Sequence, residues 1–155
     1  MLELQRLRDD HAAALLEFEV TNREFFARTV LDRGDAYFER FEDRHAALLA
    51  EQEAGSCHFH VLTDDGAVLG RFNLVDVEDG SAELGFRVAE RSAGRGLATL
   101  GVQRVIVLAR DDYGLRQLTA GADRTNAASL AVLRRTGFVP VTETDHGIQH
   151  ARDLR

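Results

Sequence analysis

The first third of the chain has helically spaced apolar side chains after a short alternating segment. Residues 2–7 alternate between apolar and polar positions, which predicts a strand. Asp9 or Asp10 can cap a helix that runs through about Val20. A second helix is predicted over residues 35–53. Its expected buried side consists of Phe38, Phe41, Ala46, Leu48 and Leu49. This part of the chain is therefore predicted to be mainly helical.

The period then changes to two, which is typical of strands. Strands are predicted over residues 58–62, 67–75 and 81–88. The connections Asp64-Asp65-Gly66 and Glu78-Asp79-Gly80 have turn sequences, so the three strands are expected to form an antiparallel meander. On the third strand, Ala82, Leu84, Phe86 and Val88 share one face, and Glu83, Gly85 and Arg87 share the other.

The remaining elements alternate between helix and strand. A long apolar helix is predicted over residues 96–112, and a strand follows over residues 116–122. A strand, a helix and another strand in this order predict a parallel pair of strands. Asn126 can cap a further helix. The last strands are predicted over residues 138–141 and 148–154. The expected fold class is α+β, with a mixed, mainly antiparallel sheet that contains one parallel junction.

A glycine-containing segment, Arg91-Ser92-Ala93-Gly94-Arg95-Gly96-Leu97-Ala98, connects the third strand of the meander to the long helix. The first N–H groups of a helix have no partner within the helix, and the helix dipole adds partial positive charge there. Glycines let a bulky anion approach the backbone, so a phosphate or pyrophosphate suits this position. The segment lacks the Gly-Lys-Ser/Thr of a P-loop and the longer glycine pattern of dinucleotide-binding folds. By itself it indicates either an anion site or a simple turn.

Composition narrows the class of protein. The 155 residues suit one domain, which we expect to span residues 1–155. The net charge of −7 disfavours nucleic-acid binding and suits a cationic partner. Cys57 is the only cysteine, and no apolar run is long enough to cross a membrane. We therefore expect a cytoplasmic protein that binds neither nucleic acid nor membrane, as a monomer or a homodimer.

Two segments of the chain carry a family resemblance when they are taken together. The first is Arg91–Ala98, and the second is Asn126-x-x-Ser129 followed by Leu133-Arg134-Arg135-Thr136-Gly137-Phe138. They resemble the Q/R-x-x-G-x-G/A coenzyme loop and the N-x-x-S…V-L-x-R-x-G-F motif of the GNAT superfamily of acyl-CoA N-acyltransferases. The second motif, with Gly70–Leu74 and Ala82–Val88, is similar to the branch that contains ribosomal-protein N-terminal acetyltransferases. The resemblance covers nearly the whole chain. It implies a sheet flanked by about four helices, in which the two parallel strands splay apart.

The resemblance also implies a co-substrate, acetyl-CoA. Amides of Gly94–Thr99 would hold its pyrophosphate, and its pantetheine arm would add to the backbone near Val88–Glu90 like an extra strand. A backbone N–H at that place would polarise the thioester carbonyl. The coenzyme-binding residues implied in this way are Val88, Ala89, Glu90, Arg91, Gly94, Arg95, Gly96, Leu97, Ala98, Thr99, Asn126 and Ser129.

An attacking amine must lose a proton, and Glu83 is the candidate general base because it lies on the strand next to the expected splay. It would act through a water molecule. The alternative interpretation of Glu83 is a surface carboxylate without a catalytic role. Glu143, His146 and His150 are alternative bases, because the C-terminal hairpin that carries them can reach the acceptor side.

The departing thiolate needs a hydrogen-bond donor. Many GNAT enzymes use a tyrosine seven residues after the asparagine of the second motif, but here that position is Leu133. The resemblance implies Ser129 as the substitute, which would donate a hydrogen bond to the sulfur. The alternative role of Ser129 is simply that of a residue in the first turn of a helix.

These expectations converge on an acetyl-CoA-dependent N-acetyltransferase that transfers the acetyl group by direct attack of a primary amine. The resemblance suggests a protein N-terminal α-amine as the acceptor. A small cationic amine, such as an aminoglycoside, a polyamine or an amino-acid derivative, is the alternative acceptor. A non-catalytic acyl-CoA-binding module is the alternative function. His58 and His60 share a strand face without a third ligand, so we expect no metal.

Overall fold

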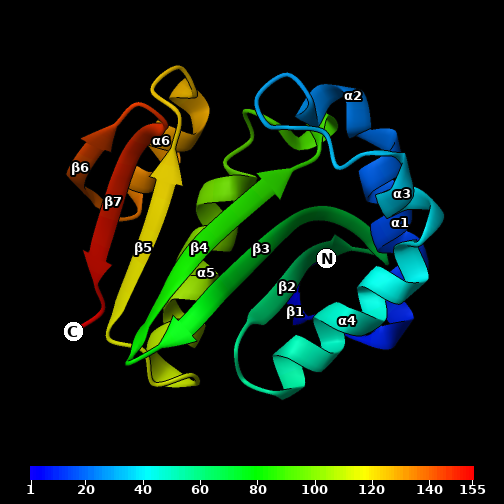
Figure 1. The fold of residues 1–155 in the computed structure, drawn as a ribbon, viewed down its shortest axis with the longest axis horizontal. Coiled ribbons are helices and arrows are strands. Elements are labelled where there is room, and N and C mark those ends of the chain that lie inside the picture. The colour runs from blue at the N-terminus through cyan, green and yellow to red at the C-terminus, as the bar shows by residue number, and fades with distance from the viewer.

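The computed structural model describes residues 1–155 and contains one seven-stranded mixed sheet (Figure 1). The strands are β1 (Leu2–Arg6), β2 (His58–Asp64), β3 (Ala67–Glu78), β4 (Ser81–Val88), β5 (Gln117–Ala122), β6 (Val139–Thr144) and β7 (Gly147–Asp153). Their order in the sheet is β1-β2-β3-β4-β5-β7-β6. The helices are α1 (Ala12–Thr21), α2 (Arg23–Phe26), α3 (Asp35–Glu39), α4 (Phe41–Glu53), α5 (Leu97–Asp111) and α6 (Ala127–Arg135). The predicted α+β class with a mixed sheet is confirmed, and the helices lie on both faces of the sheet.

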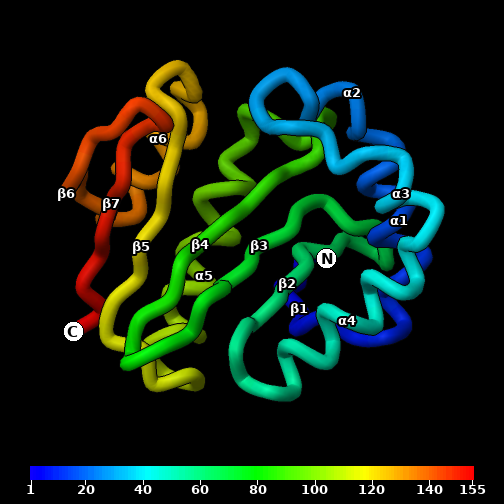
Figure 2. Tube along the Cα trace, in the orientation of Figure 1, coloured from blue at the N-terminus to red at the C-terminus, as the bar shows by residue number.

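The junction between β4 and β5 is the one parallel pairing in the sheet. Strands β1 to β4 form an antiparallel meander, and β5, β7 and β6 are also antiparallel to one another. The parallel pairing is short, because it joins only Ser81–Glu83 of β4 to Gln117–Thr119 of β5. Beyond these positions the two strands diverge, as Figure 1 and Figure 2 show. Because β3 stays paired with β4 up to Val88, the second half of β4 keeps one paired edge and leaves the edge toward β5 free.

The two faces of the sheet carry separate hydrophobic clusters. Helices α5 and α6 lie on one face, where Ala82 and Leu84 of β4 are buried. Helices α1 and α4 cover the other face over β2 and β3, where they pack on Phe59 and Val61. The alternation of β4 predicts this division, because its Ala82 side is buried whereas Glu83 and Gly85 are exposed. The helices leave the Glu83 face of β4 open.

Helix α5 approaches the sheet closely because of one glycine. Gly101 is buried in α5, and a Cβ atom placed there would lie 2.1 Å from Cζ of Phe72 in β3. Phe72 is itself fully buried. A methyl group at position 101 would therefore force α5 away from the sheet. This contact fixes the position of α5 relative to β3.

The second N-terminal helix differs from the prediction. The expected helix over residues 35–53 is broken at Arg40 (φ −111°, ψ 28°) into α3 and α4. Ala46, expected to be buried, is exposed, and His45 is buried instead. The reason is hydrogen bonding, since His45 Nε2 donates to the Arg8 carbonyl, 2.9 Å away. Gln52, also buried, donates to the Leu7 carbonyl. The buried side of α4 therefore includes polar side chains that donate hydrogen bonds to carbonyl groups just after the end of β1.

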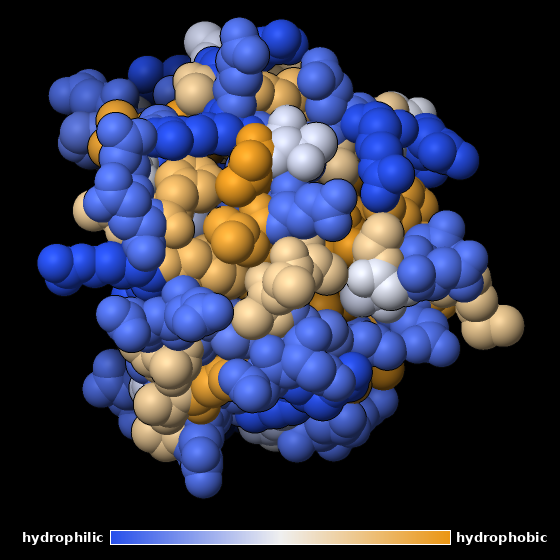
Figure 3. Space-filling model, turned by 90° about the vertical axis from the view of Figure 1, so that its right-hand side faces the viewer, coloured by the Kyte–Doolittle hydropathy of each residue, from blue (hydrophilic) through white to orange (hydrophobic).

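The surface over the N-terminal helices is mixed. Figure 3, which views the molecule from that side, shows exposed apolar side chains at the centre of the face, surrounded by hydrophilic ones. Exposed apolar residues of this region include Val20 of α1 and Val30 and Leu31 of the loop after α2. None of the helices has the length and apolar character needed to traverse a lipid bilayer.

Candidate functional site

The loop between β4 and α5 presents a row of free backbone N–H groups. None of the amides from Gly94 to Thr99 has a backbone or side-chain acceptor in the structure, and the first paired amide of α5 is Leu100, which bonds to the Gly96 carbonyl. Gly94 and Gly96 both have φ of +76°, and a Cβ atom at either position would meet nothing within 4 Å. The row is therefore open to solvent at the N-terminus of a helix, where an anion is favoured.

Side chains near this row add to its positive character. Arg91 and Arg95 are exposed, and neither forms an ion pair. The residues before the row, Val88, Ala89 and Glu90, lead from β4 into a 3₁₀ turn over Glu90–Ser92. A pyrophosphate fits this arrangement, because it needs several donors and no side chain blocks the two glycines.

Asn22, which the sequence did not single out, holds the start of this loop. Its side chain is buried at the end of α1, where Nδ2 donates to the Phe18 carbonyl at 2.8 Å. Its Oδ1 accepts a hydrogen bond from the Glu90 backbone N–H at 3.0 Å. Asn22 thus ties the N-terminal helices to the exit of β4. Its position seven residues after Leu15, on the buried stripe of α1, is the signal that indicates an inward-facing side chain.

Asn126 and Ser129 lie on the β5 side of the gap. Asn126 caps α6, as predicted, because its Oδ1 accepts from the Ser129 backbone N–H at 3.2 Å. Both residues are half-buried, and the Ser129 hydroxyl has no hydrogen-bond partner within the chain. Leu133, at the position where many GNAT enzymes have a tyrosine, is fully buried in the core under α6. It offers no polar group to the gap.

Glu83 occupies the last paired position before β4 and β5 diverge, opposite Thr119. Its side chain lies on the open face, is exposed, and forms no ion pair or hydrogen bond. The carboxylate is therefore free to accept a proton from a group in the gap, directly or through water. Gly85, the next residue on this face, leaves the sheet surface bare, since a Cβ atom there would meet nothing within 4 Å.

The alternative bases are placed less favourably. Glu143 is paired with Arg124, and His146 lies exposed in the turn between β6 and β7. His150 is buried and pairs with Ala120, whose side chain belongs to the core on the α5 face. Its Nδ1 lies 3.1 Å from the Ile148 carbonyl. His150 therefore faces away from Glu83, on the other side of the sheet.

A buried cluster of charges lies on the Glu83 face at the end of β4. The carboxylate of Glu19, in α1, is 1% exposed and contacts three guanidinium groups: Arg71 at 2.8 Å, Arg33 at 3.0 Å and Arg87 at 3.2 Å. Burial alone would raise the pKa of Glu19, but the arginines outweigh it and lower that pKa, so Glu19 is ionised. Burial also lowers the pKa of Arg87. Sequence reasoning missed this cluster.

His58 and His60 have partners other than a metal. Tyr113 donates its hydroxyl to His60 Nε2 at 2.6 Å, and its ring stacks on that of His58 at 3.8 Å. Arg6 donates to the same hydroxyl at 2.9 Å. The two histidines therefore join β2 to the end of α5.

A separate groove lies elsewhere on the molecule. It has a volume of about 590 Å³ and runs between β1 and α5, with Leu4 and Val107 in its lining. None of the expected site residues borders it. Its lining includes one carboxylate, Glu3, which accepts a hydrogen bond from Gln5, but no row of unpaired donors, so we place the functional site at the gap between β4 and β5.

Comparisons with known proteins agree with this architecture. Residues 1–139 match the family model described as "Acetyltransferase (GNAT) domain". The chain is 26% identical over 133 residues to the probable N-acetyltransferase YjcK of Bacillus subtilis, which covers 79% of this chain and 72% of that protein. The ribosomal-protein-S5-alanine acetyltransferase of Vibrio fischeri is similar in structure, with a TM-score of 0.89 and 16% identity over 99% of this chain and 93% of that one.

A second solved structure, RimJ of Mycobacterium smegmatis in complex with CoA-disulfide, has a TM-score of 0.86 and 22% identity, covering 98% of this chain and 81% of that one. At these identities the solved structures establish the shared fold, and the family model covers most of the chain. The chain belongs to the GNAT family of N-acetyltransferases.

Proposed function

We propose that the protein transfers an acetyl group from acetyl-CoA to a primary amine by direct attack, without an acyl-enzyme. The observation that carries this proposal is the row of unpaired amides from Gly94 to Thr99 beside a β4 edge that β5 leaves free. A likeness to RimJ of M. smegmatis, solved with a CoA derivative, supports the same ligand here. When bound, the coenzyme supplies an activated acetyl group as a thioester.

The residues on the β4 side of the gap would bind and orient the coenzyme. The amides of Gly94–Thr99 would hold the pyrophosphate, with Arg91 and Arg95 adding positive charge. The free edge of β4 near Val88 would hydrogen-bond an extended arm as a neighbouring strand does. Donors on that edge would also stabilise negative charge on the carbonyl oxygen under attack.

Glu83 and Ser129 would handle the protons. An aliphatic ammonium has a pKa near 10 and an N-terminal α-amine near 8, so a base is needed at neutral pH. The free Glu83 carboxylate would take this proton through water, and the unpaired Ser129 hydroxyl would donate to the leaving sulfur. The free carboxylate also argues for an enzyme over a non-catalytic acyl-CoA-binding module.

For the acceptor we propose an α-amine, such as that of a protein N-terminus. The support is the overall likeness to the ribosomal-protein-S5-alanine acetyltransferase of V. fischeri and to RimJ of M. smegmatis. A small cationic amine would have to lie beside the cluster of three arginines at the end of β4, where like charges repel.

A panel of acceptors tests this proposal. The protein is mixed with acetyl-CoA and one amine at a time, and free thiol is followed with a colorimetric reagent. We expect thiol release with α-amines of short peptides or amino acids, and little with spermidine. Tight coenzyme binding without thiol release for any amine would favour the binding module instead.

A further inference from the structure

The charges around Glu19 do not balance. Three guanidinium groups, from Arg33, Arg71 and Arg87, share this single carboxylate, so the cluster has two positive charges in excess. The neighbouring group of Arg23, Asp32 and Asp35 has one net negative charge, so it offsets only part of this excess. The chain as a whole has a net charge of −7, so this positive region is local. An excess of buried positive charge is costly unless an anion offsets it.

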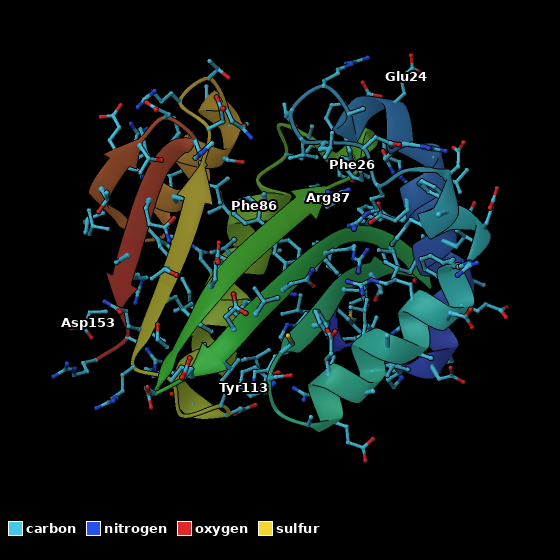
Figure 4. The ribbon with its side chains drawn as sticks, viewed as in Figure 1. Glu24, Phe26, Phe86, Arg87, Tyr113 and Asp153 are labelled. Atoms are coloured by element: carbon cyan, nitrogen blue, oxygen red, sulfur yellow. The ribbon has the colours of Figure 1, made fainter.

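Arg87 is the partly exposed member of the cluster with the most donors left for a ligand. The side chains of Arg33 and Arg87 are 28% and 22% exposed, whereas that of Arg71 is only 5% exposed. Arg33 donates to Glu19 through both Nε and Nη2. Arg87 donates to Glu19 only through Nη1, so its Nε and Nη2 are free to donate. The guanidinium lies over the Phe26 ring at 4.6 Å, and Figure 4 shows the two side chains together between the end of β4 and α2. The ring and Glu19 hold the fork in one orientation, which suits bidentate binding of a carboxylate.

The cluster shares a strand face with the candidate base. Glu83, Gly85 and Arg87 alternate along β4, with Gly85 about 6.6 Å from each of the other two at ~3.3 Å per residue. The bare surface at Gly85 leaves room for an acceptor between them. Asn73 of β3 is paired with Gly85, and its amide has no hydrogen-bond partner, with Oδ1 buried. An acceptor held near Gly85 would thus have Arg87 on one side and Glu83 on the other.

We propose that Arg87, supported by Arg33 and Arg71, is an anion subsite that binds a carboxylate carried by the acceptor close to its reacting amine. This inference rests on the proposed acetyltransferase function and narrows its acceptor to amines with a nearby negative charge. Two sources provide this chemistry: the main-chain carboxylate of a free amino acid, and an acidic first side chain in a peptide. Polyamines and aminoglycosides lack such a group.

Matched acceptor pairs test the subsite. The first pair is L-alanine and L-alaninamide; the second is the C-terminally amidated peptides Asp-Ala-Ala-Ala and Asn-Ala-Ala-Ala. For each pair, kcat/KM for the carboxylate acceptor is divided by kcat/KM for its neutral partner, both in the wild type and in Arg87→Gln. Comparing the two ratios cancels the difference in amine basicity within a pair. In the wild type we expect kcat/KM for the carboxylate acceptor of one pair to be about 10- to 100-fold higher than for its neutral partner, because of a charge-assisted hydrogen bond.

Arg87→Gln should remove that gain by raising KM for the carboxylate acceptor, with the neutral acceptor and acetyl-CoA affinity unchanged. Arg87→Lys should retain part of it. Arg104→Gln, on the exposed side of α5 with no ion pair, is the matched control and should behave as wild type. A response confined to the alanine pair identifies the main-chain carboxylate, and one confined to the peptide pair identifies the side chain. Equal ratios in wild type and Arg87→Gln for both pairs would overturn the proposal.

A binding experiment separates the subsite from the catalytic function. The side-chain Nε–H signals of the arginines are followed by NMR during titration with L-alanine or with L-alaninamide, without coenzyme, and again with each of the two peptides. The proposal predicts that a carboxylate ligand shifts the Arg87 signal and that its neutral partner does not, even if no acceptor releases thiol. If neither carboxylate ligand shifts it, the subsite is wrong, whatever the outcome of the acetylation assay.

Discussion

At the residue scale, the side chains around the gap differ in whether they already have a partner. Glu19 and Asn22 are fully engaged with other residues and fix the geometry. Glu83 and the Ser129 hydroxyl are unpaired and remain available to a substrate. Arg87 combines both conditions, since one nitrogen is engaged and the others are free. The unpaired groups are therefore those whose substitution should affect turnover more than folding.

Replacing Glu83 by glutamine removes basicity and keeps the shape of the side chain. We expect turnover at neutral pH to fall about 10²-fold, with little change in the Michaelis constant for acetyl-CoA, because a positioned base typically contributes at least that factor. Steady-state rates from pH 6 to 9 provide the measurement. Full turnover across that range would make the carboxylate structural and turn attention to Glu143, which shares the hairpin with His146.

Ser129→Ala tests the donor to the leaving sulfur. The hydroxyl has no partner within the chain, so its removal should leave the helix cap at Asn126 intact. We expect transfer to slow about 10²-fold while coenzyme affinity, measured by calorimetry, stays nearly constant. A wild-type rate would show that Ser129 only occupies the first turn of α6.

Sequence reasoning located the residues with local signals and missed those with distant partners. The glycines of the loop and the cap Asn126 are recognisable from neighbouring residues alone. The cluster is not, because Glu19 meets Arg71 52 positions away and Arg87 68 positions away. One clue was present: Glu19 lies on the same stripe of α1 as the buried Leu15 and Phe18. A charged residue on such a stripe requires a partner that the sequence does not identify.

At the element scale, strand and helix positions were predicted well where apolar periodicity is clear. The prediction for β4, over residues 81–88, is confirmed. β5 begins one residue later than predicted, and α5 is one residue shorter at each end. The bounds of the last strands were predicted less well. β6 begins at Val139, one residue later than predicted, because Phe138 is buried in the core, and it extends to Thr144. In α4, the pattern of apolar residues predicted that Ala46 is buried, whereas the polar His45 is buried because it binds the Arg8 carbonyl.

Gly101→Ala tests how α5 is positioned. In an unpacked helix this change would stabilise by roughly 1 kcal/mol. Here the new methyl group would overlap Phe72, and overpacking of this kind costs about 1–3 kcal/mol. We expect a net loss in the free energy of unfolding in urea. The double variant Gly101→Ala/Phe72→Leu should recover part of it, and an increase in stability for the single variant would contradict the packing described for α5.

At the scale of the whole molecule, the splayed junction organises everything else. Alternation and the strand–helix–strand order predicted a parallel pair, but only the family resemblance predicted that the pair would open. The reason is that pairing stops after Glu83 and Thr119 without any local sequence signal. The helical layers then hold the opened strands in place: α5 from one face, and α1 with Asn22 from the other.

Acid should loosen this scaffold through His60. Burial lowers its pKa to about 4, compared with 6.5 in an unfolded chain, so the unfolded state takes up the proton first as the pH falls. Stability is retained above pH 6.5 and lost progressively toward pH 4, by about 3 kcal/mol from this group. Urea unfolding at pH 7 and pH 4 should show a correspondingly smaller loss for His60→Gln. An identical loss in both proteins would exclude His60 as the cause.

The central claim is that the amides of Gly94–Thr99 bind the pyrophosphate of the coenzyme, and Gly96→Asp tests it most directly. The aspartate would place a negative charge and a side chain in the row. Gly66→Asp is the control, because Gly66 also has positive φ (+86°) and open space at its Cβ, but lies in the turn between β2 and β3. Titration calorimetry with acetyl-CoA should give an affinity at least 10-fold weaker for Gly96→Asp and unchanged for Gly66→Asp. Equal affinities for wild type and a folded Gly96→Asp variant would contradict the account.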